Sequence, residues 1–315
     1  MTASPTALAL PNDLLTGVEW NAAQIAEMFR LTADIKERPS AYSGAMGGRF
    51  IALIMEKPSL RTSMTFQIGM QSMGGSAILL DHTVSRLGDR ESVPDMARNL
   101  SRWVQGIVAR VFEQQKLEQL AEYASIPVIN ALSNRFHPCQ ACADFFTLQE
   151  RFGSGNLRGL KLAYVGDGNN VCHSLMAVGA LLGARIRVGT PKGYEPSADI
   201  LAETRRIAVG CGGTIELFAT AEEAVADAQA IYTDVWASMG QEAEAGTREK
   251  IFASFQVNTR LVESAAPGAV FLHCLPAHRG AEVTDAVMDS ARSIVFDQAE
   301  NRLHVQKAIL LMLIR

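Results

Sequence analysis

A thiol, two histidines and an arginine lie within seven residues in the segment 269–279, which reads AVFLHCLPAHR. The apolar start of this segment predicts a buried strand, and Pro276 ends it because proline cannot continue a β-ladder. Cys274 is therefore expected at the carboxyl end of a strand, the edge at which open α/β sheets bind ligands. A lone cysteine in such a place is more often a buried structural residue, so a functional assignment depends on the other motifs.

A second set of polar residues follows the apolar run FIALIM at 50–55 and reads SLRT at 59–62. We expect these residues at a strand-to-helix turn, where free backbone N–H groups and the helix dipole favour an anion. A serine N-cap beside an exposed arginine explains the pattern equally well. Arg110 is expected near the end of the strand 106–112, either as a cation for the substrate or as a salt-bridged surface residue.

Two further motifs stand where helices are expected to begin. The sequence HPCQ at 137–140 opens a helix, because proline suits the first helical position and keeps the preceding residue out of the helix. His137 and Gln140 then face the helix N-terminus, although His137 could simply cap the turn. The turn GDGNN at 166–170 follows another strand, but it lacks the third glycine of a dinucleotide loop and is a weak cofactor signal.

Strands and helices alternate along both halves of the chain, which indicates an α/β fold with mainly parallel sheets. The 315 residues suffice for two domains, each a mainly parallel β-sheet flanked by helices, joined by linking helices. We expect the first domain at 1–150 and the second at 151–298, with a terminal helix 299–315 that packs back on the first domain. The segment 234–248 has no regular pattern and is expected to be a functional loop.

Composition excludes several classes of protein. A net charge of −4 argues against a nucleic-acid binder or a basic membrane-surface protein. The five cysteines have no metal-ligand spacing and are most simply free thiols in a reducing compartment. No apolar run approaches the length of a membrane span, and the start of the chain lacks the basic region of a signal peptide. We therefore expect a cytoplasmic protein with no membrane partner.

Four motifs together resemble the aspartate/ornithine carbamoyltransferase family. They are Ser-Leu-Arg-Thr at 59–62, His-Pro-Cys-Gln at 137–140, Asp234 with Ser238-Met239-Gly240, and His-Cys-Leu-Pro at 273–276. They occur in the family's order and spacing, and the resemblance runs from about Leu15 to the end of the chain. The last two motifs look specific for the ornithine branch.

The resemblance implies transfer of the carbamoyl group of carbamoyl phosphate to the δ-amine of L-ornithine, which gives L-citrulline and phosphate. It implies a homotrimer, or a larger assembly of trimers, with sites shared between subunits and with neither a metal nor an organic cofactor. The reaction belongs to arginine metabolism, and its direction in the cell is left open. The alternatives are a carbamoyltransferase for another amine, such as putrescine or an N-acylornithine, and a non-catalytic homologue that binds phosphate.

The resemblance also assigns roles to residues. The catalytic residues would be Arg110, His137, Asp234 and Cys274. Carbamoyl phosphate would be bound by Ser59, Leu60, Arg61, Thr62, Arg86, Arg110, His137, Gln140, Cys274, Leu275 and Arg302. Ornithine would be bound by Asn170, Asp234, Ser238 and Met239. Two positions depart from the usual pattern: Ser63 stands where the family usually has arginine, and Arg86 stands where many members have glutamine or histidine.

Overall fold

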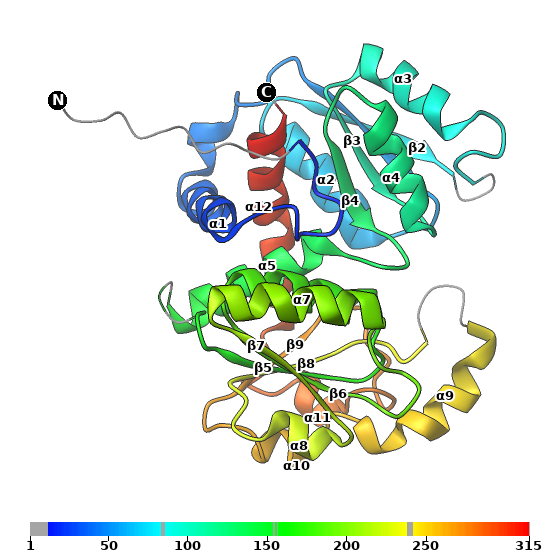
Figure 1. Cartoon of the computed structure of the whole chain (residues 1–315). Helices are drawn as coiled ribbons and strands as arrows, with labels where there is room; N and C mark the ends of the chain where they lie inside the picture. Colours follow the sequence, from blue (N-terminus) through cyan, green and yellow to red (C-terminus); the bar gives the residue numbers. More distant parts are fainter. Residues whose placement is uncertain (1–11, 83–85, 154, 156, 238–241, 315) are drawn as a thin grey trace.

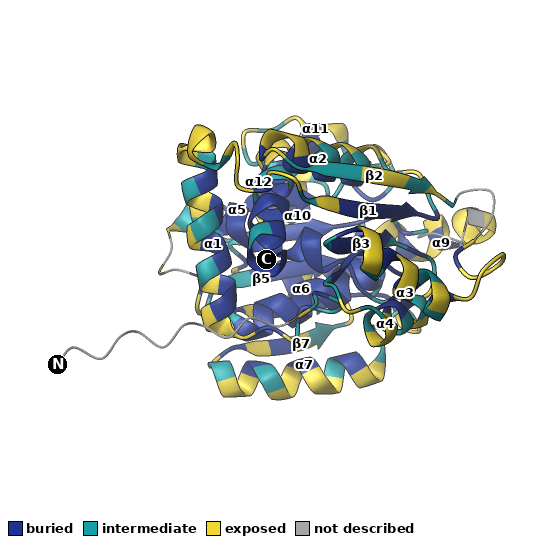
Figure 2. Ribbon diagram, turned by 90° about the horizontal axis from the view of Figure 1, so that it is seen from above, coloured by how far each residue is buried: buried dark blue, intermediate teal, exposed yellow. Residues whose placement is uncertain are grey.

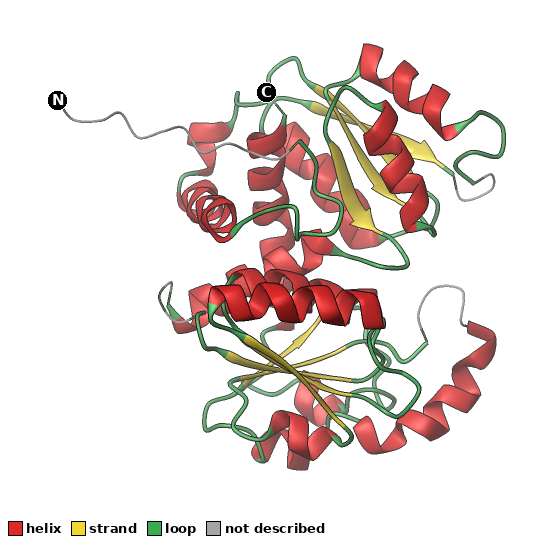
Figure 3. Ribbon diagram, in the orientation of Figure 1, coloured by secondary structure: helices red, strands yellow, loops and turns green. Residues whose placement is uncertain are grey.

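The chain folds into two parallel β-sheets, each covered by helices, as expected for an α/β protein (Figures 1 and 3). This computed structural model describes residues 12–82, 86–153, 155, 157–237 and 242–314. Ser238 and Met239, expected to bind ornithine, lie outside the described residues. Among the described residues, no helix is both long enough and apolar enough to span a membrane.

The first sheet has four parallel strands in the order β2-β1-β3-β4. Its strands are β1 (Phe50–Met55), β2 (Ser76–Asp81), β3 (Gly106–Arg110) and β4 (Val128–Leu132). Its helices are α1 (Ala22–Glu37), α2 (Leu60–Ser72), α3 (Val93–Trp103) and α4 (Gln114–Tyr123), with a 3-10 turn, η1 (Pro39–Tyr42). Met55 pairs with both Asp81 and Arg110, so the ends of three strands are level at one edge of the sheet.

The second sheet has five parallel strands in the order β7-β6-β5-β8-β9. They are β5 (Lys161–Val165), β6 (Arg185–Gly189), β7 (Thr214–Phe218), β8 (Ala230–Thr233) and β9 (Val270–His273). The longer helices here are α6 (Asn170–Leu181), α7 (Ala198–Cys211) and α9 (Ala245–Phe252). The short elements are α8 (Ala221–Val225), η2 (Glu242–Glu244), η3 (Ala253–Phe255), α10 (Thr259–Glu263) and α11 (Asp285–Met288).

Two helices connect the halves of the molecule. Helix α5 (Pro138–Phe152) leads from the first sheet to the second and packs on α6. Helix α12 (Val295–Leu313) returns from the second half and packs against α1, α2 and α5 (Figure 1). Figure 2 shows that buried residues fill the centre, whereas exposed residues line the outer faces of α3 and α7. The terminal helix thus packs against three helices that precede the second sheet in the chain.

Two boundaries differ from the expectation. The terminal helix begins at Val295, four residues before 299, and the segment expected as a loop up to Arg248 contains η2 and the start of α9. Both helices start without a side-chain cap, at Ile294 and Glu244 respectively. The sequence therefore lacks the Ser, Thr, Asp or Asn signal that usually marks a helix start.

Candidate functional site

The segment after β1 forms the expected strand-to-helix turn. Ser59 has an extended backbone, and its side-chain oxygen accepts the N–H of Thr62 at 3.3 Å, which caps α2. The side chain of Leu60 is exposed, so this residue can offer a ligand in the turn only its backbone N–H. The turn therefore presents N–H groups and the positive end of a 13-residue helix to one edge of the first sheet.

Three arginines from separate elements meet beside this turn. Arg61 donates to the carbonyl oxygen of Leu275, and Arg302 donates to the side-chain oxygen of Gln140. A second nitrogen of Arg302 lies 3.5 Å from the hydroxyl of Thr62. Arg110, at the end of β3, is half-buried, and partial burial together with the nearby Arg302 and Arg61 lowers its pKa to about 10. The three guanidinium groups therefore repel one another in a poorly solvated place.

His137 faces the same three arginines as a neutral imidazole. It is the N-cap of α5, but its side chain makes no capping hydrogen bond, so the simple capping role is wrong. Burial, and then the charges of the three arginines, hold the pKa of His137 well below its usual value. Its Nδ1 has no hydrogen-bond partner among the described residues. The backbone N–H of His137 donates to the Ser174 hydroxyl at 2.6 Å, which fixes its place against α6.

Gln140 is oriented by a buried carboxyl group that the sequence did not reveal. Asp144, one turn further along α5, accepts from the amide of Gln140 at 2.8 Å and from the amide of Gln298 at 2.6 Å. The oxygen of Gln298 accepts the backbone N–H of His273 at 3.0 Å. Burial raises the pKa of Asp144 to about 7. This network connects β9 of the second sheet to the arginine cluster of the first.

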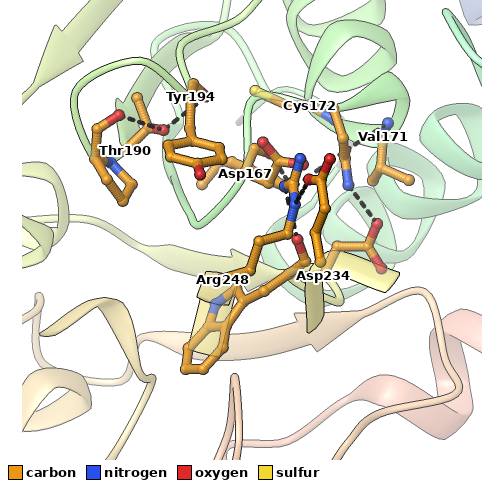
Figure 4. Close-up of polar contacts among 12 residues, drawn as sticks. Asp167, Val171, Cys172, Thr190, Tyr194, Asp234 and Arg248 are labelled. Carbon is orange, nitrogen blue, oxygen red and sulfur yellow. Dashed lines mark hydrogen bonds and ion pairs between the residues drawn. The ribbon is translucent and has the colours of Figure 1, made fainter. Parts of the chain in front are cut away.

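Cys274 and Asp234 lie side by side at the carboxyl ends of β9 and β8. The thiol donates to one oxygen of Asp234 at 3.0 Å. The side-chain amide of Asn169 donates to the other oxygen at 2.8 Å, and Figure 4 draws this bond as the dashed line at Asp234. Burial and the Asp234 charge raise the pKa of Cys274 well above its usual value. Cys274 is thus a protonated thiol that acts as a hydrogen-bond donor. It is not suited to be a nucleophile, because a nucleophilic cysteine needs a lowered pKa.

Asn170 follows Asn169 in the chain, but its side-chain amide is turned towards the first half of the chain. It donates to the backbone oxygen of Ser133 at 2.6 Å. Nearby, Arg248 of α9 pairs with the buried Asp167 at 2.9 Å and donates to the backbone oxygen of Trp236, also at 2.9 Å (Figure 4). The ion pair ties α9 and the segment after β8 to the turn after β5. These contacts therefore fix the described residues that precede Ser238 and those of α9 that follow it in the chain.

Arg86 does not reach the arginine cluster. Its guanidinium lies over the ring of Phe112, 4.5 Å from the ring centroid, and the residue is exposed. The segment is held by Glu56, whose buried carboxylate accepts the N–H groups of Leu87 at 2.8 Å and Phe112 at 2.7 Å. Among the described residues, no hydrogen bond or ion pair joins the Arg86 side chain to the three clustered arginines.

The only group of possible metal ligands among the described residues is Asp234, His273 and Cys274, whose donor atoms lie within 4.8 Å of one another. Their hydrogen-bonding capacity is already used. Nδ1 of His273 accepts the N–H of Leu275 at 2.8 Å, and its Nε2 faces Glu282 at 3.3 Å. With the thiol donating to Asp234, the cluster is better described as a hydrogen-bonded group than as an open set of ligands.

The comparisons with known proteins agree with this geometry. A family model described as "Aspartate/ornithine carbamoyltransferase, carbamoyl-P binding domain" matches residues 12–150, and one described as "Aspartate/ornithine carbamoyltransferase, Asp/Orn binding domain" matches residues 158–313. The ornithine carbamoyltransferase of Thermococcus kodakarensis is 54% identical, covering 84% of this chain and 83% of that protein. The solved structure of the Pyrococcus furiosus enzyme has a TM-score of 0.92 at 48% identity, covering 96% and 97% of the two chains. The Thermus thermophilus structure has a TM-score of 0.87 at 44% identity, covering 98% and 100%.

Asp144 should make stability depend on pH. Its folded-state pKa of about 7 lies above the ordinary aspartate pKa of 3.8, so between these values the folded state binds a proton that the unfolded state has lost. Wild-type stability should therefore fall relative to Asp144→Asn as the pH rises from about 4 to about 7, and the difference should then stay constant. One pKa unit corresponds to about 1.4 kcal/mol. The difference in melting temperature between the two proteins should change by about 2 °C or more between pH 5 and pH 8. A difference that is independent of pH, measured by calorimetry, would contradict the assignment.

Proposed function

The chain belongs to the aspartate/ornithine carbamoyltransferase family, and from that membership we propose that it transfers the carbamoyl group of carbamoyl phosphate to the δ-amine of L-ornithine. The products are L-citrulline and phosphate. The observation that carries the proposal is the cluster of Arg61, Arg110 and Arg302 around a neutral His137. Their mutual repulsion would be relieved by a dianion such as carbamoyl phosphate bound among them.

Carbamoyl phosphate binds, in this proposal, with its phosphate at the turn 59–62 and its carbamoyl group towards β9. Backbone N–H groups of the turn and the guanidinium of Arg61 hold the phosphate. Thr62, Arg110 and His137 surround the carbonyl oxygen, which gains negative charge during attack. The side-chain oxygen of Gln140 and the Leu275 carbonyl accept from the carbamoyl amide, and Arg302 and Cys274 lie beside that group. Arg86 completes the phosphate site of a neighbouring subunit.

The δ-amine of ornithine attacks the carbonyl carbon with its lone pair. The bond from that carbon to the bridging oxygen breaks, phosphate departs with the electron pair, and the amine loses its proton to the departing phosphate. Because the amine is the nucleophile, no covalent intermediate on the enzyme is required. Asp234 and Cys274 orient the amine, while Asn170, Ser238 and Met239 hold the α-amino acid end. The chemistry is thus mainly positioning and charge stabilisation.

The same proposal divides the chain into two domains. Residues 1–150 bind carbamoyl phosphate, residues 151–298 bind ornithine, and the terminal helix returns to the first domain.

The five cysteines are free thiols, as in proteins of a reducing compartment, and this supports a cytoplasmic enzyme.

We also infer a homotrimer. Leu60, Met64 and Ile68 form an exposed apolar stripe on α2, and Ile78 and Leu79 are exposed on the edge strand β2, which packs beside that helix. An apolar edge strand is usually covered in a native protein. Arg86 follows β2 closely in the chain, so a subunit that docks on this face would receive Arg86 near its own arginine cluster.

Replacement of Ile68 by aspartate should break the trimer. A charge in the apolar stripe would be buried without a partner at the interface, whereas the same change at Val209, which is 78% exposed on α7, should have no effect. Light scattering should show the mass of three 34.1 kDa chains for the wild type and Val209→Asp, and of one chain for Ile68→Asp. A wild-type monomer with full activity would contradict the trimer.

Arg61→Ala should lower kcat/KM for carbamoyl phosphate by about 100-fold or more, because a charge-assisted contact to the phosphate is lost. Arg30→Ala is the matched control, since Arg30 is an exposed residue of α1 that pairs with Glu27. Citrulline formation is the readout for both variants. Unchanged affinity for carbamoyl phosphate in Arg61→Ala would refute the anion site.

Wild-type enzyme should prefer ornithine to putrescine by about 10⁴-fold in kcat/KM. A site with polar groups for the α-carboxylate leaves those groups unpaired when putrescine enters, because putrescine keeps the second amine but has no carboxylate. N-acylornithine lacks the α-ammonium and should also react poorly. Steady-state rates with the three amines decide among the candidate reactions. Equal rates for ornithine and putrescine would leave a carbamoyltransferase of another specificity, and no product with any amine would favour the non-catalytic homologue.

A further inference from the structure

Leu275 has a backbone conformation that is unfavourable for its side chain. Its φ is +59°, and among the described residues only Asp227 and Leu275 have a positive φ without being glycine. A branched L residue adopts this left-handed region at a cost in free energy, and it persists there only where the surrounding structure holds it. The consequence is that the Leu275 carbonyl points at Arg61, inside the proposed carbamoyl phosphate site.

The imidazole of His273 holds this conformation directly. Its Nδ1 accepts the N–H of Leu275 at 2.8 Å, a local bond from a side chain to the backbone two residues later. Because Nδ1 acts as an acceptor, we assign the proton to Nε2, which faces the carboxylate of Glu282 at 3.3 Å. His273 is buried, so no exposed alternative rotamer competes with this arrangement.

Glu282 fixes the imidazole to the core of the second sheet. It is fully buried, and its carboxylate also accepts the backbone N–H of His278. Its backbone oxygen accepts the N–H of Val257 at 2.9 Å, and the adjacent Val283 packs in the apolar cluster that contains Val257 and Phe271. The chain of contacts therefore runs from a rigid core, through Glu282 and His273, to the backbone of Leu275.

We propose that His273 and Glu282 are positioning residues for carbamoyl transfer, which act by holding Leu275 in its left-handed conformation. Neither residue touches the reacting atoms. The inference rests on the proposed function, because it supposes that the Leu275 carbonyl receives the carbamoyl amide. The proposal explains why the Leu275 carbonyl points into the site. The contact with Arg61 and the neighbouring Cys274 do not by themselves hold the backbone of Leu275 in this conformation.

Two substitutions of His273 separate positioning from packing. In His273→Asn the side-chain oxygen stands where Nδ1 stood and can accept the Leu275 N–H, as in an Asx turn, but Glu282 loses its donor. In His273→Gln the amide can still reach Glu282, but the Leu275 N–H loses its acceptor. The first variant should therefore be the less stable, because it leaves a buried carboxylate with fewer partners. The second should be the worse enzyme.

The two variants should rank in opposite order for stability and for activity. His273→Gln should lower kcat/KM for carbamoyl phosphate by about 10- to 100-fold, and His273→Asn by no more than about threefold, although His273→Asn should have the lower melting temperature. Val225→Ala, which truncates a buried side chain of α8 in the same apolar cluster, is the control for stability alone and should melt lower with an unchanged KM for carbamoyl phosphate. In a Leu275→Gly background, His273→Gln should lower kcat/KM by a smaller factor than in wild type, because glycine adopts the positive φ without support. Activities that follow melting temperature across all variants would overturn the proposal.

Amide hydrogen exchange gives a test that does not depend on turnover. Exchange of the Leu275 N–H should be faster in His273→Gln than in wild type and close to wild type in His273→Asn. Equal exchange in the two variants would overturn the positioning role even if the enzyme were fully active. If wild-type protein made no citrulline, the proposed function would fail, while the exchange result would still decide whether His273 holds Leu275.

Discussion

Repulsion among three guanidinium groups, two half-buried and one buried, is the constraint on which the site depends. The pKa of Arg110 falls only to about 10, so the group stays charged at neutral pH, and the fold must hold the three arginines against their repulsion until an anionic ligand supplies a counter-charge. The structure holds Arg61 and Arg302 with neutral acceptors, namely the Leu275 carbonyl, the Gln140 amide and the Thr62 hydroxyl. A neutral acceptor fixes direction without cancelling charge, so the electrostatic demand for an anion is retained.

The acceptors must themselves be held, and here the two halves of the chain become interdependent. Gln140 is oriented by Asp144, which is also bonded to Gln298 of α12, and Gln298 accepts the N–H of His273 in β9. Helix α12 thus does more than cover the first sheet. It carries Arg302 into the cluster and links the edge of the second sheet to α5, so that a change in the angle between the sheets would alter the carbamoyl end of the site.

The sequence predicted what depends on local patterns. The strand-to-helix turn at 59–62, the helix start at Pro138 and the strand end before Cys274 follow from apolar runs, proline and capping residues, and all three are confirmed. Asn169 caps α6, but its bond to Asp234 joins residues 65 apart and could not be predicted from the local sequence. Asp144, Glu282 and Gln298 look like ordinary helix or loop residues in sequence. Their importance comes from burial and from partners far along the chain, which no periodicity encodes.

The placement of the buried acids follows from the same electrostatics. A carboxylate among the arginines would pair with them and compete with the phosphate, yet the residues around the cluster need strong acceptors to hold them. Glu56, Asp144 and Glu282 satisfy both requirements because each is separated from the arginine cluster by the group that it binds. Glu56 holds backbone N–H groups beside Arg86 and Arg110, Asp144 holds Gln140, and Glu282 holds His273. Each acid binds a neutral group and thereby fixes the position of that group in the site. The positive charge of the arginines is not neutralised and stays available to the substrate.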